Sequence, residues 1–372
     1  MKEIKDYIDG LIDGSSPQNP QWNVESVRSK KAPYWNYIDG CMMTSLYSLY
    51  ISSGEKKYFD FVKNYIDYFL DDEGNIKTYD KEKYNLDDIN EGRVLFDLYG
   101  ATGDEKYKKA IFNLYAQLKD QPRTKTGNFW HKKIYPDQIW LDGVYMAQPF
   151  YCRYLTAFSK ADYSDVVSQV KNVRRLMFDK KKGLYYHGID CSKKAFWADK
   201  KGLSSSFWLR SEGWFLVALA DLSEYLHEKT AKKEIDKIFI EAVRGIVGYV
   251  DKKTHMFYQV IDKGGKEGNY VETSGSLMVS YALMKGARLN VLPKDYGDLG
   301  KKIFKGVVKK QLTLSDEGEI TLKGICLVAG LGPENNRRRD GSYEYYVSEP
   351  IVDNDAKGVA PLVMCYAELQ NS

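Results

Sequence analysis

Residues 35–50, WNYIDGCMMTSLYSLY, and residues 57–70, KYFDFVKNYIDYFL, decide the fold of this chain. In the second segment apolar residues recur at steps of three and four from Tyr58 to Phe69, and Lys and Asp occupy the other positions. This spacing predicts an amphipathic surface helix. The first segment is apolar nearly all round, as expected of a helix that is buried on every side.

The buried type of segment recurs along the chain. Six such segments begin near Trp35, Asn85, Asp137, Ser205, Tyr270 and Asn354. Charged amphipathic segments and Gly/Asp-rich turns follow several of them, so the unit is a helical hairpin plus a loop of about 50 to 80 residues in total. One partner helix cannot bury an all-apolar helix, so the units must stack. We therefore expect an all-α fold, an (α/α)6 barrel with an inner and an outer ring, and an open α-solenoid is the alternative.

The 372 residues contain no Pro/Ser-rich linker and no break in composition. We expect a single catalytic domain over residues 1–372. Connections that carry acids, His and Trp mostly precede the buried segments, so these side chains should gather at one rim of the barrel.

Composition excludes some classes of partner. Lys plus Arg number 55 against 51 Asp plus Glu, and no charged block is long enough to suggest a nucleic-acid tail. No uncharged apolar run reaches the roughly 18 residues that a membrane span needs. The start of the chain, MKEIKDYIDGLIDG, lacks the layout of a signal peptide. Five scattered cysteines without a CxxC pair favour reduced thiols, so we expect a cytoplasmic protein, with a monomer as the default.

Aromatic residues make up 14% of the chain, with 30 Tyr and 7 Trp. They could form a large aromatic core, or line a cleft for the apolar faces of sugars. Signatures of serine hydrolases, nucleotide-binding proteins and metalloproteases are absent: the chain has no GxSxG, Walker, GxGxxG or HExxH motif. We therefore expect no catalytic transition metal.

Acidic residues lie at the starts of the buried segments, namely Asp39, Asp87, Asp88, Asp142 and Glu212. Helix capping is the simple explanation for each. Asp142 differs because Trp140 and Leu141 precede it and Val144 to Met146 follow it. Burial among such neighbours would raise the pKa of this carboxyl, whereas a helix N-terminus would lower it, and the sequence leaves the balance open.

Basic side chains also stand beside aromatic residues. His131 and His187 lie in extended segments that lead to buried helices, whereas His227 and His255 have charged neighbours and are expected in solvent. Arg210 lies between Trp208 and Trp214. It could form a salt bridge with Glu212 or a neighbouring acid, or bind a substrate carboxylate with its guanidinium fork. The run NRRRD (336–340) is expected at the solvated surface.

The strings NLDDINEGRVLFDLYGATGDEKY, GNFWHKKIYPDQIWLDGVYMAQPF, YYHGID, SSSFWLRSEGW and GSYEYYVSEPIVDNDAKGVAPLVM resemble glycoside hydrolase family 105, in order and from about Trp35. These enzymes are the unsaturated rhamnogalacturonyl hydrolases and their relatives. The resemblance implies an (α/α)6 barrel that acts on oligosaccharides left by polysaccharide lyases, such as pectin (rhamnogalacturonan) fragments. An acid protonates C4 of the 4,5-unsaturated uronic acid and water adds at C5. No cofactor is implied.

The resemblance also implies roles for single residues. Asp142 of WLDG is the expected general acid and base, and Asp87 of LDxI stands beside the substrate, or Asp88 if the register differs. Expected substrate-binding residues are Tyr37, His131, Trp140, Met146, His187, Trp208, Arg210 and Trp214, with Glu349 as a weaker addition.

Three other functions remain open. Family 88 enzymes hydrate unsaturated glucuronyl units in the same way. Sugar 2-epimerases share the fold and use paired His, but they would leave Asp142 without a role. A non-catalytic sugar-binding protein would keep the Trp and Arg residues and would need no acid. Within the third buried segment, Pro149 is expected to kink or end the helix.

Overall fold

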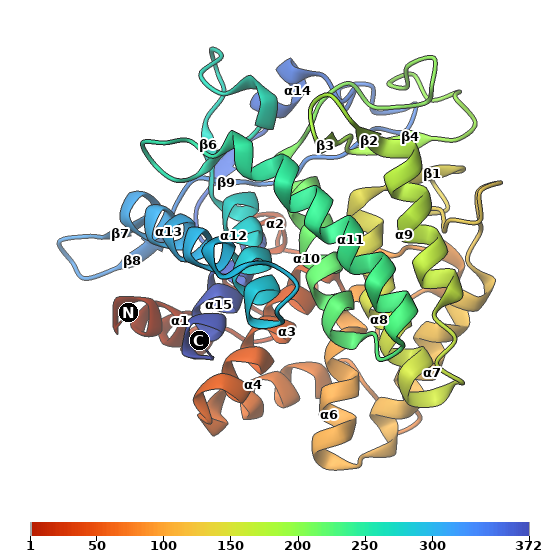
Figure 1. The fold of residues 1–372 in the computed structure, drawn as a ribbon. Coiled ribbons are helices and arrows are strands. Elements are labelled where there is room, and N and C mark those ends of the chain that lie inside the picture. Colours follow the sequence, from red (N-terminus) through yellow and green to blue (C-terminus); the bar gives the residue numbers. More distant parts are fainter. Residues whose placement is uncertain (1, 372) are drawn as a thin grey trace.

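The computed structural model describes residues 2–371 and has an inner ring of helical segments (Figure 1). They are α3 (Tyr37–Ser53), α5 (Asp87–Asn90) with the 3-10 turn η2 (Glu91–Val94) and α6 (Leu95–Thr102), α8 (Leu141–Phe158), α10 (Leu209–Tyr225), α12 (Thr273–Arg288) and α15 (Ala356–Gln370). Each segment packs against the next, and α15 packs against α3. The ring is therefore closed, which confirms the (α/α)6 barrel and excludes the open solenoid.

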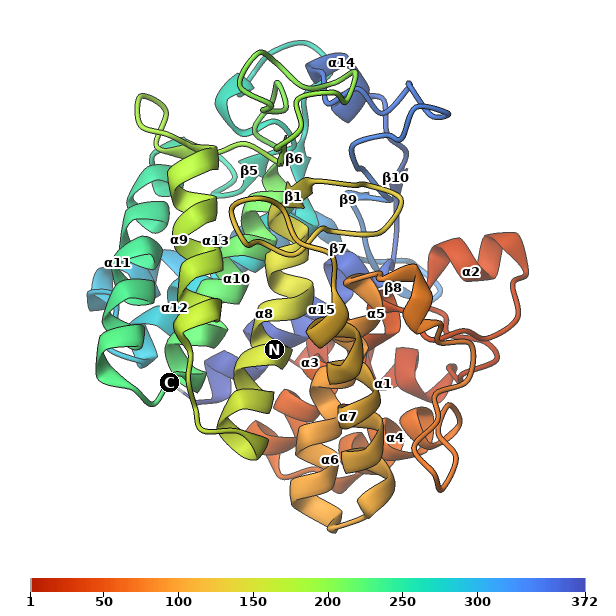
Figure 2. The same ribbon diagram turned by 90° about the vertical axis from the view of Figure 1, so that its right-hand side faces the viewer.

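Amphipathic helices cover the ring from outside (Figure 2). They are α1 (Lys2–Asp13), α4 (Lys56–Asp67), α7 (Glu105–Asp120), α9 (Ser164–Met177), α11 (Lys229–Ile246) and α13 (Lys294–Gln311). Each buries its apolar stripe, as Tyr58, Val62 and Tyr65 of α4 show. Helix α1 is tied to the segment that leads into α15, because Tyr7 Oη donates to Asn354 Oδ1 at 2.8 Å.

The second inner segment departs from a regular helix. Residues 85–100 were expected to form one buried helix, but α5, η2 and α6 divide it. A Cβ on Gly40 of α3 would lie 2.5 Å from Glu91 Cα, so the two backbones touch at the 3-10 turn. Buried Glu91 also accepts a hydrogen bond from the Asn36 backbone N–H at 2.6 Å. The tight turn thus lies where α3 and η2 meet most closely.

Short elements gather mainly at the end where the inner helices begin. The described residues form five antiparallel pairs of strands, β1 (Gln138–Trp140) with β4 (Gly188–Asp190), β2 (Phe178–Asp179) with β3 (Leu184–Tyr185), β5 (Phe257–Tyr258) with β6 (Val271–Glu272), β7 (Leu312–Leu314) with β8 (Ile320–Leu322), and β9 (Ile325–Cys326) with β10 (Ile351–Val352). The short helices are α2 (Val24–Ser29), α14 (Tyr343–Val347), η1 (Lys81–Lys83), η3 (Val247–Tyr249) and η4 (Ile261–Lys263).

Three further expectations concern Pro149, membrane-spanning helices and the cysteines. Pro149 does not end α8, which continues to Phe158, because the buried residues on both sides of the proline keep this segment within the core. No helix among residues 2–371 is long and apolar enough to cross a membrane. The five cysteines are free thiols, and four of them are buried.

Candidate active site

A cavity of about 220 Å³ opens at the end of the barrel where the inner helices begin. Of the ten site residues predicted from the sequence, nine line it: Tyr37, Asp87, His131, Trp140, Asp142, Met146, Trp208, Arg210 and Trp214. The tenth, His187, lies fully buried behind Asp142. The expected gathering of acids, His and Trp at one rim is therefore confirmed.

Pairing of β1 with β4 brings Asp142 and His187 together. The strands place Trp140 opposite Gly188, and the Leu141 N–H donates to His187 O at 3.1 Å. Asp142 follows in the first turn of α8, where His187 Nε2 lies 3.1 Å from its Oδ2. The other ring nitrogen of His187, Nδ1, is 2.6 Å from Tyr346 Oη. A carboxylate, an imidazole and a phenol thus form one buried chain.

The sequence left open whether the pKa of Asp142 is raised or lowered, and in the structure it is lowered. Burial alone would raise it, but the charge of His187 and its contact with the carboxyl, with a smaller contribution from His131, hold the pKa below its usual value. His131 is affected in another way, because burial lowers its pKa to about 4. His131 is therefore a neutral imidazole near pH 7. Asp142 and His187 lie close enough to exchange a proton directly.

Asp87 holds the second acidic position. Its Oδ2 accepts a hydrogen bond from Lys132 Nζ at 2.5 Å, and its Oδ1 lies 3.8 Å from His131 Nε2. Its neighbour Asp88 is not among the cavity-lining residues and accepts from the Asn85 side chain at 3.0 Å. Burial and the charge of Asp87 raise the pKa of Asp88 to about 7. The geometry therefore favours Asp87 over Asp88 as the residue that faces a ligand.

Aromatic rings form much of the cavity wall. His131 stacks on Trp140 with ring centroids 4.4 Å apart, and Trp214 stacks on Tyr145 at 4.5 Å. The indole N–H groups of Trp140 and Trp208 donate to Gln138 and Gln259. These two rings can thus offer apolar faces to a sugar, while their N–H groups are already occupied.

Arg210 is held by backbone carbonyls. It donates from Nη1 to Cys326 O at 2.5 Å and to Ser274 Oγ at 3.3 Å, and from Nη2 to Leu327 O at 3.4 Å. It forms no salt bridge with Glu212, whose Oε1 accepts from the Tyr185 N–H at 2.7 Å. The alternative of an Arg210–Glu212 pair is therefore wrong.

The remaining predicted acids have structural roles. Asp39 accepts hydrogen bonds from Trp22 Nε1 at 2.9 Å and from the Asn36 side chain at 2.8 Å. Glu349 pairs with Arg338 at 2.7 Å and does not line the cavity. His227 and His255 are exposed, as expected.

Sequence reasoning missed a set of cavity and supporting residues. They are Glu25, Lys132, Tyr135, Val328, Ala329, Gly330 and Arg339 in the wall, and Tyr346 behind it. Arg339 belongs to the run NRRRD, so the expectation that this whole run is solvated surface is wrong. Lys132 follows His131 directly and could have been found from its position. Arg339 carries no such signal, because a run of three arginines resembles a surface segment.

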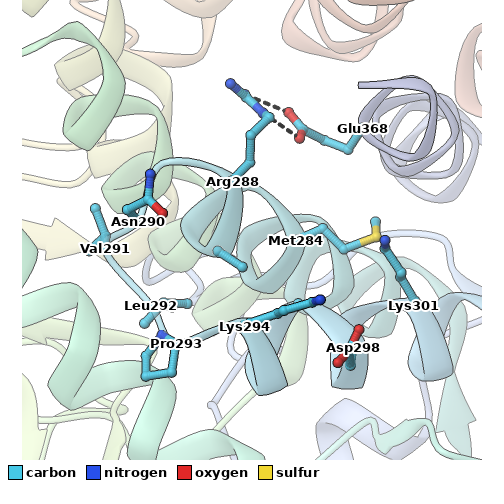
Figure 3. A pocket seen from close by; sticks show the side chains of 12 residues that line it. Met284, Arg288, Asn290, Val291, Leu292, Pro293, Lys294, Asp298, Lys301 and Glu368 are labelled. Atoms are coloured by element: carbon cyan, nitrogen blue, oxygen red, sulfur yellow. Dashed lines mark hydrogen bonds and ion pairs between the residues drawn. The ribbon is translucent and has the colours of Figure 1, made fainter. Parts of the chain in front are cut away.

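A larger hollow of about 770 Å³ lies at the junction of α12 and α13 (Figure 3). Apolar and charged side chains and the amide of Asn290 line it, with no aromatic residue among the described lining residues. Glu368 in its wall is already paired with Arg288 at 2.8 Å. This hollow lacks the stacking surfaces of a sugar site. Within residues 2–371 no group of three or more His, Cys, Asp or Glu could hold a metal ion.

The closed helical barrel thus carries two acids and three Trp at one rim, an arrangement suited to a carbohydrate-active enzyme. The model of Glycosyl Hydrolase Family 88 matches residues 11–372, so the chain belongs to this family.

Three individual proteins bear on the resemblance to family 105. The solved glycoside hydrolase from family 105 of C. acetobutylicum ATCC 824 is 38% identical, with a TM-score of 0.90 over 100% of this chain and 99% of that one. Protein Atu3128 of Agrobacterium fabrum is 38% identical over 191 residues, 50% of this chain and 82% of its own. Unsaturated rhamnogalacturonyl hydrolase YesR of Bacillus subtilis is 24% identical over 265 residues, 68% of this chain and 72% of its own. The resemblance to family 105 is thus confirmed.

Proposed function

We propose that this glycosidase removes a 4,5-unsaturated uronic acid from the non-reducing end of lyase-generated oligosaccharides, with rhamnogalacturonan fragments of pectin as the first substrates to test. The observation that carries the proposal is the contact of Asp142 with His187 at the floor of an aromatic cavity. The similarity to YesR supports the rhamnogalacturonyl substrate.

The charges of the cavity suit an acidic sugar. Lys132, Arg210 and Arg339 all line it, and each could donate to a uronate carboxylate. The rings of Trp140, Trp208 and Trp214 could pack against the apolar faces of the sugar. A cavity of about 220 Å³ is smaller than the roughly 300–1,000 Å³ of sites for drug-sized ligands, which suits one terminal ring.

The proposed reaction needs one proton donor that becomes a base. Asp142 delivers the proton that it shares with His187 to C4, and the electrons of the C4=C5 bond form the new C–H bond. Positive charge develops at C5 and on the ring oxygen. Water adds at C5 and returns a proton to Asp142, so the site is regenerated. The resulting hemiketal opens and releases the shortened saccharide, and Asp87 orients the ring beside Lys132.

The conjugated enol-ether carboxylate of the substrate absorbs in the ultraviolet, and its loss follows the hydration directly. We expect a decaying signal and released rhamnose when the protein meets an unsaturated rhamnogalacturonan disaccharide. Asp142→Asn should lower kcat by a factor of about 100 to 10,000 while substrate binding persists. Wild-type rates in this variant would refute the mechanism.

Inert rhamnogalacturonan disaccharides would direct the assay to unsaturated glucuronyl substrates, the family 88-like specificity. If those disaccharides were inert as well, yet bound, the chain would be a non-catalytic sugar-binding protein. Turnover of either class makes the uronate-containing oligosaccharide the partner of this site. Monomeric state and cytoplasmic location belong to the same proposal, and sedimentation and fractionation would test them.

A further inference from the structure

His187 has a polar contact at each nitrogen of its ring, an ion-pair contact at Nε2 and a hydrogen bond at Nδ1. Nε2 lies 3.1 Å from Asp142 Oδ2, and Nδ1 lies 2.6 Å from Tyr346 Oη. Both His187 and Tyr346 are completely buried. Tyr346 lies on α14, 159 residues away in the sequence, and its ring stacks on Trp208 with centroids 5.7 Å apart. Trp208 in turn lies 4.8 Å from the His187 ring. The phenol is therefore held against the imidazole from two directions.

The hydroxyl of tyrosine can both donate and accept a hydrogen bond. When it donates to Nδ1, a neutral His187 carries its proton on Nε2, directed at the Asp142 carboxylate. When His187 and Asp142 together hold a second proton, Nδ1 is protonated and the same hydroxyl accepts from it. Because the site is buried, a partner that serves both states avoids the cost of an unpaired polar group in either of them.

We propose that Tyr346 is a positioning residue that fixes the tautomer of His187 and so keeps the catalytic proton between His187 Nε2 and Asp142. This inference rests on the proposed hydration reaction. In the resting state the pair holds two protons. One passes from Asp142 to C4 of the substrate while the Tyr346 hydroxyl still accepts from Nδ1–H, and the proton taken later from water returns to Asp142 and restores the resting state.

Other titratable groups surround the chain without contacting Nδ1. Asp142 comes from α8 and His131 from the segment before β1. Cys326 of β9 and Tyr345 and Asp340 of the C-terminal segment face Tyr346, and the Arg210 guanidinium lies 5.0 Å from the Trp208 ring. Within residues 2–371, Tyr346 Oη is the hydrogen-bond partner of Nδ1, and no other is found. A change at this hydroxyl should therefore act on His187 before it acts on any other group.

The test compares the pH dependence of kcat/KM in the wild type and in Tyr346→Phe, followed by ultraviolet absorbance. Without the Tyr346 hydroxyl, the Nδ1–H of His187 has no hydrogen-bond partner in the core when His187 and Asp142 together hold two protons. This doubly protonated state is therefore disfavoured. Because the doubly protonated state is the active one, the alkaline limb of the kcat/KM profile should move to lower pH by about one unit. Tyr343→Phe is the matched control. Tyr343 lies on the same helix, and its hydroxyl donates to Glu267 O and not to His187. The pH profile of Tyr343→Phe should therefore equal that of the wild type.

A Tyr346→Phe profile that is lowered but has an unmoved alkaline limb would reduce Tyr346 to a packing residue and overturn the proposal. Nitrogen-15 chemical shifts of the four His rings supply a second measurement, which needs neither substrate nor variant. We expect the proton of neutral His187 on Nε2, and a proton on Nδ1 instead would overturn the proposal even if Tyr346→Phe did not fold. An inert wild type with the expected shifts would reject the proposed reaction and leave the hydrogen-bond chain intact.

Discussion

Lys132 Nζ lies 2.5 Å from Asp87 Oδ2 in the wall of the cavity. The two residues come from separate segments, which a hydrogen bond from the Leu86 N–H to His131 O joins at 3.2 Å. The ammonium group at this place balances the charge of Asp87, and its other N–H groups can donate to the carboxylate of a sugar. Lys132 therefore connects the second acid to substrate binding.

Replacing Lys132 by Met should raise KM for an unsaturated uronyl disaccharide about tenfold or more, because a hydrogen bond to a charged group is lost. We expect a smaller change in kcat. The matched control is Lys133→Met, since Lys133 is exposed and donates only to Glu82 O at 3.3 Å. Steady-state kinetics of the three proteins provides the comparison. An unchanged KM in Lys132→Met would remove this residue from the binding site.

Arg210→Lys should lower both affinity and stability. Lys keeps the charge but cannot reproduce the fork that reaches Cys326 O, Leu327 O and Ser274 Oγ. Loss of these buried bonds should destabilise the fold by about 1–3 kcal/mol in urea unfolding. Arg175→Lys, an exposed position on α9, should change stability by less than about 0.5 kcal/mol. Equal stabilities of the two variants would contradict the inferred role of the fork.

Gly143→Ala should separate activity from stability. A Cβ at position 143 would lie 3.0 Å from His131 Nδ1, so the imidazole that stacks on Trp140 must shift. We expect kcat/KM to fall by about tenfold or more with little loss of fold stability, since small displacements in a site are costly to catalysis. Gly100→Ala, at an exposed position of α6, is the control, because a Cβ there would meet no atom within 4 Å beyond its own helix and chain neighbours. That variant should be about 0.4–1 kcal/mol more stable and equally active.

The alternation of buried and amphipathic helices could be predicted because it depends on local spacing alone. The site could be predicted where its residues stand at the start of an inner helix, as Asp142 and Arg210 do. Tyr346 could not, since it meets His187 only after the barrel closes. The same holds for the lowered pKa of Asp142, which depends on a His 45 residues further along the chain. Arg339 was missed because a local run of arginines carries no information about the loop that turns one of them inward.

A buried network of charged side chains inside the barrel leads to a last prediction, which concerns the stability of the fold. Asp221 of α10 accepts from Arg93 at 2.5 Å and from Lys285 at 2.7 Å, and all three side chains are at most 4% exposed. Asp221→Asn leaves buried Arg93 without its carboxylate partner and Lys285 with Glu224 alone, and should cost about 3–5 kcal/mol in urea unfolding at pH 7. Asp236→Asn breaks a pair with Lys232 on outer helix α11, and should cost less than about 1 kcal/mol.

The same network sets a pH dependence. Burial would raise the pKa of Asp221, but Lys285 and Arg93 hold it below the usual value. A carboxyl with a pKa lowered on folding stabilises the protein fully above its unfolded pKa of about 3.9, and this contribution is lost as pH falls toward the folded value. Wild-type stability should therefore decline below about pH 4 to 5. The difference between the wild type and Asp221→Asn should narrow over the same range, and a constant difference from pH 7 to pH 3 would show that the charge of Asp221 is not what stabilises the barrel interior.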